Sequence, residues 1–291
     1  MNKKAKRVDL APYLMVLPLA ILFFIFHTIP FLKGVFYSFT DWPGYGSWHF
    51  VGLRNYLYMF TNNQISQSYW FTFKFAFFAT VLVNAISLAL AVGLNSNIKY
   101  KKLLRAIYFL PYMLGTLIVG FIFNYIFGTM VPTFAKGLGW SSLTTSILGT
   151  DHAWIGILIV TLWQGLAFNI LIYLSGLQSI DEEIYEAAVI DGANPWTKFW
   201  KVTFPLIAPF FTINLVLSVK GYLMVFDQIM AMTGGGPGNS TTSISVLIYS
   251  QGFNGSQFAI QSANAVVLFI IIAAISLLQL HILSKREERL R

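Results

Sequence analysis

The side chains that could perform chemistry are few and scattered along this chain of 291 residues. No histidine has a partner at metal-ligand spacing; the four are His27, His49, His152 and His281. Outside the segment 181–191 and the C-terminal tail, the carboxylates are Asp9, Asp41, Asp151 and Asp227. Acid–base catalysis and metal binding both require such groups to converge. The sequence therefore predicts no catalytic residue and no metal site, and it does not favour an intramembrane enzyme.

Nucleotide and thiol chemistry are disfavoured in the same way. The chain has no cysteine, which leaves out disulfides and thiolate zinc sites. Three glycines at 234–236 are not followed by the Gly-Lys-Ser/Thr of a phosphate-binding loop. Any nucleotide that drives the action of this protein is therefore expected to bind to another chain.

Composition indicates a polytopic membrane protein. Hydrophobic residues make up 56% of the chain and charged residues 10%, which is too little polar surface to cover a soluble globule. Crossing a hydrocarbon core takes roughly 20 apolar residues, and six windows qualify. They are 10–32, 72–94, 104–127, 153–174, 205–226 and 259–283. The first is too long for a secretory signal, and no small-residue cleavage site follows it, so we expect it to be retained.

The basic residues predict the orientation of these spans. Of nineteen Lys and Arg residues, fourteen fall on one side of the predicted membrane and four on the other, with Lys220 inside a span. The fourteen are Lys3, Lys4, Lys6, Arg7, Lys99, Lys101, Lys102, Arg105, Lys198, Lys201, Lys285, Arg286, Arg289 and Arg291; the four are Lys33, Arg54, Lys74 and Lys136. Because cytoplasmic loops carry the excess of Lys and Arg, we expect both termini in the cytoplasm. This division also explains the net charge of +8 without a nucleic-acid partner.

A polar stretch between the fourth and fifth windows predicts a helix-turn-helix outside the membrane. Asp181 is an N-cap candidate, two glutamates follow in the first turn, and Gly192 comes after the last apolar residue as a terminator. Asn194 and Pro195 then cap and begin a second helix. Ala187 and Ala188 predict a surface of small residues that another protein could approach closely. An amphipathic helix at the membrane interface is the alternative.

The spacing within this stretch resembles the EAA loop of binding-protein-dependent ABC importer permeases. Glu-Ala-Ala, three residues and Gly are matched, and two prolines, Pro205 and Pro209, follow at the expected distance. The matching residues are Glu186, Ala187, Ala188, Asp191, Gly192 and Ala193. Val202 and Phe204 depart mildly from the usual Ile and Leu. In the family this loop docks on a cytoplasmic ATPase, and the resemblance implies the same role for 181–203.

The resemblance covers all six spans and carries further expectations. It implies an all-α, MetI-like type I importer fold that forms one transmembrane permease domain over 1–291, with its core at about 70–285. It also implies a second permease subunit that differs from this chain in sequence, two ATP-binding cassette subunits and an extracellular solute-binding protein. The expected location is the bacterial cytoplasmic membrane, where the chain crosses several times. ATP and Mg would bind the partner ATPase, with no cofactor on this chain.

The fourth and fifth windows supply the residues of a candidate substrate path. In the fifth window, Asn214, Ser218, Gly221 and Tyr222 share one helical sector, and Lys220 points roughly the opposite way. A face of this kind could stack against and hydrogen-bond a sugar, but it could equally pack helices together. The candidates from both windows are Gly165, Phe168, Asn169, Asn214, Ser218, Gly221 and Tyr222.

Two outer segments bear on the substrate and the partners. The run Thr233 to Gly238 predicts a flexible, tightly turned loop, and its place after the fifth span resembles the carbohydrate branch of the family. Aromatic residues between 33 and 71 are typical of an interfacial belt, and a docking surface for the external binding protein is the alternative.

Together these patterns predict the permease subunit of an ABC importer for a sugar or oligosaccharide. The alternatives are a permease for another solute, such as glycerol phosphate, and an ion-coupled secondary carrier. A carrier would usually show a coupling carboxylate within a span, and we find none.

Overall fold

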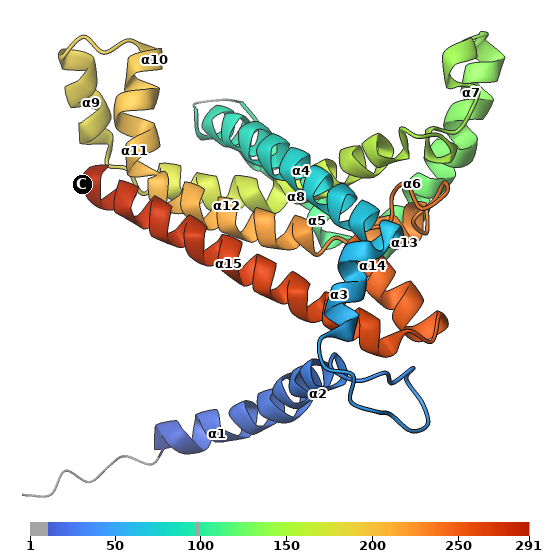
Figure 1. Cartoon of the computed structure of the whole chain (residues 1–291). Helices are drawn as coiled ribbons and strands as arrows, with labels where there is room; N and C mark the ends of the chain where they lie inside the picture. The colour runs from blue at the N-terminus through green and yellow to red at the C-terminus, as the bar shows by residue number, and fades with distance from the viewer. Residues whose placement is uncertain (1–10, 97–98, 291) are drawn as a thin grey trace, which may run out of the picture. The chain divides into compact units, whose positions relative to one another are not determined.

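A computed structural model describes residues 11–96 and 99–290, and most of these residues are helical (Figure 1). The N-terminal basic cluster, Asp9, Leu10 and Arg291 lie outside the described residues. Contacts between Cα atoms divide the chain into two compact units, Met1–Thr61 with Ile248–Val267 and Asn62–Leu247 with Leu268–Arg291. The interpretation of residues 1–291 as one transmembrane domain stays a prediction.

The first unit contains a long apolar helical stretch and a short helix, α3. Its elements are α1 (Ala11–Phe23), a π-helical segment (Phe24–Thr28), α2 (Ile29–Tyr37), α3 (Arg54–Thr61), a second π-helical segment (Ser250–Asn254) and the beginning of α15 (Phe258–Leu290). The apolar stretch ends at Tyr37, beyond the predicted boundary at residue 32. Large side chains along it are open to the surroundings: Met15 is 76% exposed and Phe26 is 75% exposed. Such a surface suits contact with lipid.

The second unit holds most of the remaining helices. These are α4 (Asn63–Asn95), α5 (Lys101–Met113), α6 (Thr116–Tyr125), α7 (Val131–Leu138), α8 (Ala153–Gln178), α9 (Glu182–Ile190), α10 (Pro195–Lys198), α11 (Phe204–Leu206), α12 (Ala208–Leu223) and α13 (Asp227–Met232). Two π-helical segments, Ile126–Met130 and Phe199–Thr203, and two 3-10 turns, Ser141–Leu143 and Ile147–Gly149, join them. The short α14 (Ile244–Tyr249) and α15 continue from one unit into the other.

The core of the second unit is built around α8. Helix α4 packs along α8, and α5, α12 and α13 also contact it. One apolar cluster near the start of α8 includes Phe75, Ile157 and Ile229. Another, nearer its end, includes Ile170 and Ile207. These contacts fix α8 and α12 beside each other, which brings the two candidate path segments together.

The predicted third span is wrong as a single helix. The window 104–127 is interrupted at Leu114 and Gly115, which both have extended backbone conformations. Pro111 lies inside α5 and has no N–H to donate, so helical hydrogen bonding weakens there. After the break, α6, a π-helical segment and α7 form a stretch, Thr116–Leu138, that is itself long and apolar enough to span. The apolar helical stretch therefore extends beyond the predicted boundary at residue 127.

The predicted fifth span is bent. Pro195–Leu206 and Ala208–Leu223 meet at an angle of 71°. Together they are long and apolar enough to cross a membrane. Ile207 has a non-helical ψ of 5°, and Pro209 cannot donate to the carbonyl four residues earlier. Among the residues that the structure describes, five helices are long and apolar enough to cross a membrane, and there are six spans if the bent pair is counted as one. The larger number equals the number of predicted windows.

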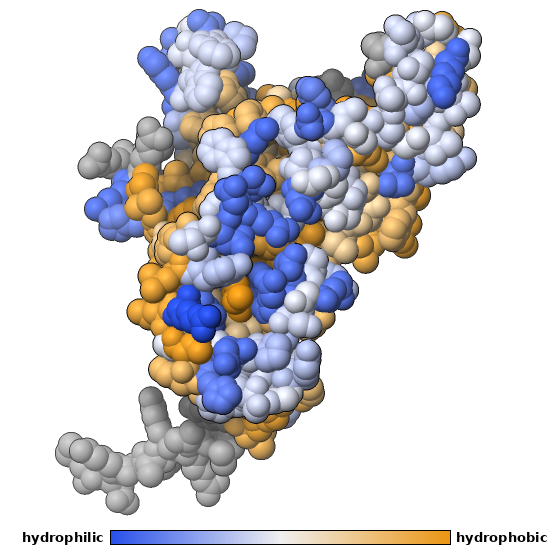
Figure 2. Space-filling view, turned by 45° about the vertical axis from the view of Figure 1, so that its right-hand side comes forward, coloured by the Kyte–Doolittle hydropathy of each residue, from blue (hydrophilic) through white to orange (hydrophobic). Residues whose placement is uncertain are grey.

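The surface is rich in hydrophobic residues. Figure 2 shows large hydrophobic areas on the face that it presents, with hydrophilic residues gathered over other parts of the same face. Large exposed apolar areas are unfavourable in water and are typical of surfaces that contact lipid or another protein.

Candidate functional site

The segment 181–203 folds into a helical hairpin of α9, a turn, and α10 with its π-helical continuation, which projects away from α12 in Figure 1. Asp181 occupies the N-cap position of α9, as predicted, with an extended backbone, although its side chain forms no capping hydrogen bond. Glu182 and Glu183 lie in the first turn, where the helix dipole favours negative charge.

Gly192 ends α9 as predicted. Its φ of +76° places it in the left-handed region, which a residue with a Cβ adopts at a cost. The N–H of Gly192 donates to the carbonyl of Val189 at 3.0 Å, and the N–H of Ala193 donates to that of Ala188 at 2.9 Å. This pair of bonds is a Schellman motif. It sets the direction in which the chain leaves α9.

The second half of the hairpin is fixed by a cap and by contacts with Tyr185. The N–H of Thr197 donates to Asn194 Oδ1 at 2.8 Å, which confirms the predicted cap. Thr203 Oγ1 donates to the hydroxyl of Tyr185 at 3.3 Å, and Lys198 Nζ lies 5.5 Å from the centre of the same ring. Tyr185 of α9 thus contacts the end of α10 at Lys198 and the end of its π-helical continuation at Thr203, and so joins the two halves of the hairpin.

The exposed surface of the hairpin combines charge with apolar groups. Glu186, Ala187 and Asp191 are exposed, and Glu186 forms no ion pair with any residue that the structure describes. Ile190 is 86% exposed. Ala188 is buried, so the prediction of an open surface formed by both alanines is wrong for Ala188.

The predicted path residues surround a pocket of about 190 Å³ in the second unit. Six of the seven candidates line it: Gly165, Phe168, Asn169, Ser218, Gly221 and Tyr222. Tyr112 of α5 and Leu217 of α12 complete the wall, and no residue of the lining carries a formal charge. Such a site can hydrogen-bond and stack against a neutral polar molecule.

Asn169 is the hub of the hydrogen bonds beside this pocket. Its Nδ2 donates to the carbonyl of Gly165 at 2.9 Å, and Ser218 Oγ donates to its Oδ1 at 3.2 Å. Asn214 does not line the pocket. It is fully buried, and its Nδ2 donates to the backbone carbonyl of Asn169 at 3.1 Å, which ties α12 to α8. Asn214 therefore positions Asn169 and is not itself a wall residue.

Sequence reasoning missed Tyr112 because it treated the window 104–127 as one continuous helix. The break after Met113 separates α5 from α6, and α5 then packs against α8. The ring of Tyr112 stacks on Phe168, with centroids 5.6 Å apart and planes 23° from parallel. The sequence signal that could have identified it is an aromatic residue directly after Pro111.

The glycine-rich segment after α13 is tightly turned, as predicted, but it is extensively tethered. Thr241 Oγ1 donates to the carbonyl of Gly236 at 2.6 Å, and Thr242 Oγ1 donates to that of Gly235 at 3.1 Å. Gly235 has a φ of +96°, and a Cβ on it would lie 2.6 Å from the Thr242 hydroxyl. The expectation of a flexible loop is wrong, because buried threonines fasten it.

Comparison with known proteins adds the family. Residues 84–288 match the family described as "Binding-protein-dependent transport system inner membrane component". The chain is 38% identical to the probable starch degradation products transport system permease protein AmyD of Thermoanaerobacterium thermosulfurigenes, with 99% of both chains covered. It is 40% identical to the multiple sugar-binding transport system permease protein MsmF of Streptococcus mutans, with 94% of each chain covered.

Solved structures share the fold. A chain of a bacterial ABC transporter involved in the import of the acidic polysaccharide alginate superposes with a TM-score of 0.81 at 23% identity, covering 95% of this chain and 96% of that one. The inward-facing MetNI methionine ABC transporter gives 0.57 at 17% identity, covering 80% and 98%. The family match spans more than half of the sequence, and the relatives align over nearly all of it. The chain therefore belongs to the family of inner membrane components of binding-protein-dependent transport systems.

Proposed function

We propose that this chain is the permease subunit of an ABC importer that moves a sugar or oligosaccharide across the bacterial cytoplasmic membrane. The observation that carries this proposal is the α9–α10 hairpin. It is internally braced by Tyr185, ends α9 in a fixed geometry at Gly192, and leaves Glu186 exposed without an ion-pair partner among the described residues. A rigid element with an unpaired charge is suited to bind another protein.

The proposed assembly contains this chain, a second and different permease subunit, two ATP-binding cassette subunits and an external solute-binding protein. The excess of Lys and Arg supports cytoplasmic termini and a cytoplasmic hairpin. ATP and Mg bind the ATPase subunits, and Glu186, Ala187, Asp191, Gly192 and Ala193 form the docking region, with Ala188 packed beneath it. Closure of the ATPase pair moves the hairpin, and the spans rock between outward and inward opening.

The pocket between α8 and α12 supports a neutral sugar as the transported solute. Asn169, Ser218 and Tyr222 offer hydrogen-bonding groups, and Phe168 and Tyr112 offer ring faces. The names of the two relatives described above refer to starch degradation products and to multiple sugars. A relative of Escherichia coli O157:H7, 31% identical, is a sn-glycerol-3-phosphate permease. A phosphate dianion calls for cationic partners, and the pocket lining contains none, so we favour a sugar over glycerol phosphate.

Two substitutions in the hairpin test the coupling role. We expect Glu186→Lys and Gly192→Leu to weaken copurification of the ATPase subunits and to reduce sugar uptake at unchanged membrane levels. Asp151→Lys is the matched control, because Asp151 is exposed outside the hairpin. Normal ATPase association and uptake in both variants would contradict the proposal.

The substrate class needs a separate measurement. Calorimetry of the associated solute-binding protein against maltose, maltotriose, trehalose and glycerol 3-phosphate should give saturable binding for a saccharide. Uptake by this chain alone, driven by an ion gradient and independent of an ATPase, would instead support the carrier alternative.

A further inference from the structure

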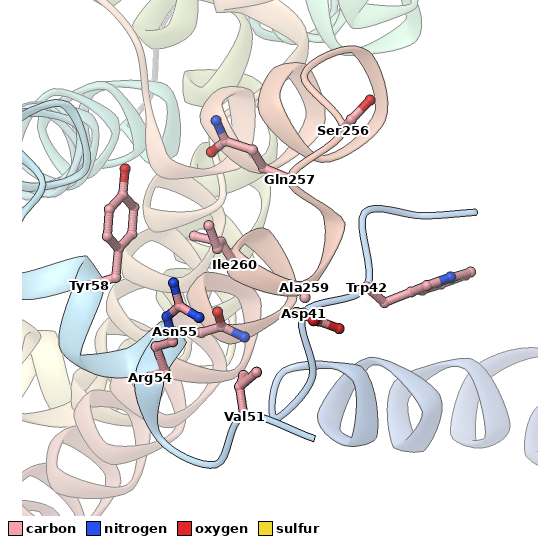
Figure 3. A pocket seen from close by; sticks show the side chains of 10 residues that line it. All are labelled: Asp41, Trp42, Val51, Arg54, Asn55, Tyr58, Ser256, Gln257, Ala259 and Ile260. Carbon is pink, nitrogen blue, oxygen red and sulfur yellow. The ribbon is translucent and has the colours of Figure 1, made fainter. Parts of the chain in front are cut away.

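A second pocket lies in the first unit, apart from the proposed path. Its volume is about 330 Å³, near the lower end of the range of about 300 to 1,000 Å³ that is typical of ligand sites. It is formed by the loop between α2 and α3, by α3 itself, and by the beginning of α15 (Figure 3). Figure 3 shows Arg54 and Tyr58 on α3 and Gln257 across the pocket, just before α15.

The walls of this pocket are fixed by hydrogen bonds of the backbone. Asn55 is buried, and its Nδ2 donates to the carbonyls of Ser38 and Thr40 at 2.8 and 2.7 Å, which fastens the loop to the start of α3. On the other side, the N–H of Ala259 donates to the carbonyl of Trp42 at 3.0 Å. A site whose walls are already ordered binds its ligand without the entropic cost of closing a loop.

Two opposite charges line the pocket without neutralising each other. Arg54 is exposed, and its guanidinium forms no hydrogen bond or ion pair with any residue that the structure describes. Asp41 is held instead by His49, whose backbone N–H donates to Oδ1 at 2.6 Å and whose Nδ1 lies 3.3 Å from Oδ2. The N–H of His49 lowers the pKa of Asp41, so this side chain is a charged acceptor at neutral pH.

The two opposite charges in the lining bear on which ligands the pocket can bind. Because Asp41 and Arg54 have opposite charges, a ligand with a single charge is attracted by one of them and repelled by the other, and the lining gives no net preference for an anion or a cation. Neighbouring hydroxyls of a sugar ring can both donate and accept, so they can satisfy a carboxylate, a guanidinium and the amide of Gln257 together. The ring of Tyr58 adds apolar surface for the C–H face of such a ring, whereas the ring of Trp42 stacks on Tyr37 with centroids 4.1 Å apart and points away from Arg54 in Figure 3.

We propose that this pocket is a second saccharide-binding site, which takes one neutral sugar residue between Asp41, Arg54 and Gln257. The saccharide class and the placement of this pocket outside the membrane rest on the proposed function. The residues that line this second pocket differ from those that line the proposed substrate path between α8 and α12. It would hold the end of a sugar near the membrane surface after release from the solute-binding protein.

Photolabelling separates the two sites. The full transporter in lipid nanodiscs is exposed to a maltotriose that carries a diazirine, irradiated and digested, and labelled peptides are identified by mass spectrometry. We expect labelling in 41–58 and 256–260 that free maltotriose suppresses. Arg54→Gln and Gln257→Ala should each reduce it, the former about tenfold, because hydrogen bonds to a charged group are lost. Lys33→Gln removes an exposed cation outside the pocket lining and should leave the labelling unchanged.

The alternative results overturn the proposal in distinguishable ways. Labelling confined to residues of the α8–α12 pocket excludes the second site but leaves sugar import intact. Labelling at neither pocket overturns the saccharide class, and with it both proposals. If Arg54→Gln leaves labelling unchanged but weakens capture of the solute-binding protein, the pocket is a protein-docking surface and the proposal is wrong.

Discussion

Gln164 of α8 donates from Nε2 to the backbone carbonyl of Leu114 at 2.9 Å, at the break between α5 and α6. The carbonyl of Pro111 lies 3.5 Å from the same nitrogen. A break in a helix inside a membrane frees backbone groups that must find other partners, and Gln164 supplies one.

We predict that Gln164→Leu lowers the free energy of unfolding by about 1 to 2 kcal/mol, because the Leu114 carbonyl loses its partner. Unfolding in detergent mixtures measures this. Thr161→Val is the matched control on the same helix, since the buried Thr161 hydroxyl has no hydrogen-bond partner among the described residues and its removal should cost less. Equal losses in the two variants would show that the bond to Leu114 contributes nothing.

Ser218→Ala should raise the KM of sugar uptake about three- to tenfold without changing the amount of assembled transporter. The substitution removes a hydroxyl from the pocket wall and frees Asn169 Oδ1, and one hydrogen bond accounts for an effect of this size. Ser175→Ala is the control, because Ser175 is exposed on α8 and does not line the pocket. An unchanged KM for Ser218→Ala would remove this residue from the proposed path.

Gly165→Ala should reduce uptake several-fold while the fold is retained. A Cβ at this position would lie 2.5 Å from the hydroxyl of Tyr222, so the phenol must shift within the pocket. Gly221→Ala also adds a methyl group to the lining but meets no atom within 4 Å. Transport assays compare Gly165→Ala, which displaces the Tyr222 ring, with Gly221→Ala, which adds a methyl group without a clash. Equal uptake by the two variants would argue against Tyr222 as a path residue.

Gly192→Ala should destabilise the end of α9 by about 1 kcal/mol, because a Cβ disfavours the left-handed conformation. No atom lies within 4 Å of the added group, so the cost comes from the backbone alone. Hydrogen exchange of 186–193 should speed up. Gly93→Ala, at an open helical position of α4, should instead be neutral or stabilising. Unchanged exchange in Gly192→Ala would contradict the role given to the Schellman motif.

The loop between α2 and α3 should lose protection in acid. Because bonding to His49 lowers the pKa of Asp41 below its ordinary value of 3.8, the carboxylate stabilises the folded loop above that value. The stabilisation is lost as the pH falls through the lowered pKa. Hydrogen exchange of 41–51, corrected for intrinsic rates, should therefore rise as the pH falls below 3.8. Asp41→Asn should abolish this dependence; a persistent rise in the variant would assign it to another group.

The sequence by itself predicted the membrane spans apart from the third, the cap at Asn194, the end of α9 at Gly192 and six of the pocket residues. These features depend on local chemistry: apolar length, hydrogen bonding by a neighbouring side chain, left-handed backbone, and a shared helical sector. Such signals are contained within a few turns of chain, so no partner element is needed to recognise them.

The tertiary structure alone decided what depends on distant neighbours. It broke the third window at Leu114 where Gln164, fifty positions later, could satisfy the freed carbonyl. It buried Asn214, which donates a hydrogen bond to the carbonyl of Asn169, and it placed Tyr112 in the pocket lining. It also buried Ala188. A helical pattern states which residues share a face. Packing against another helix decides whether that face becomes a wall, a contact or an open surface.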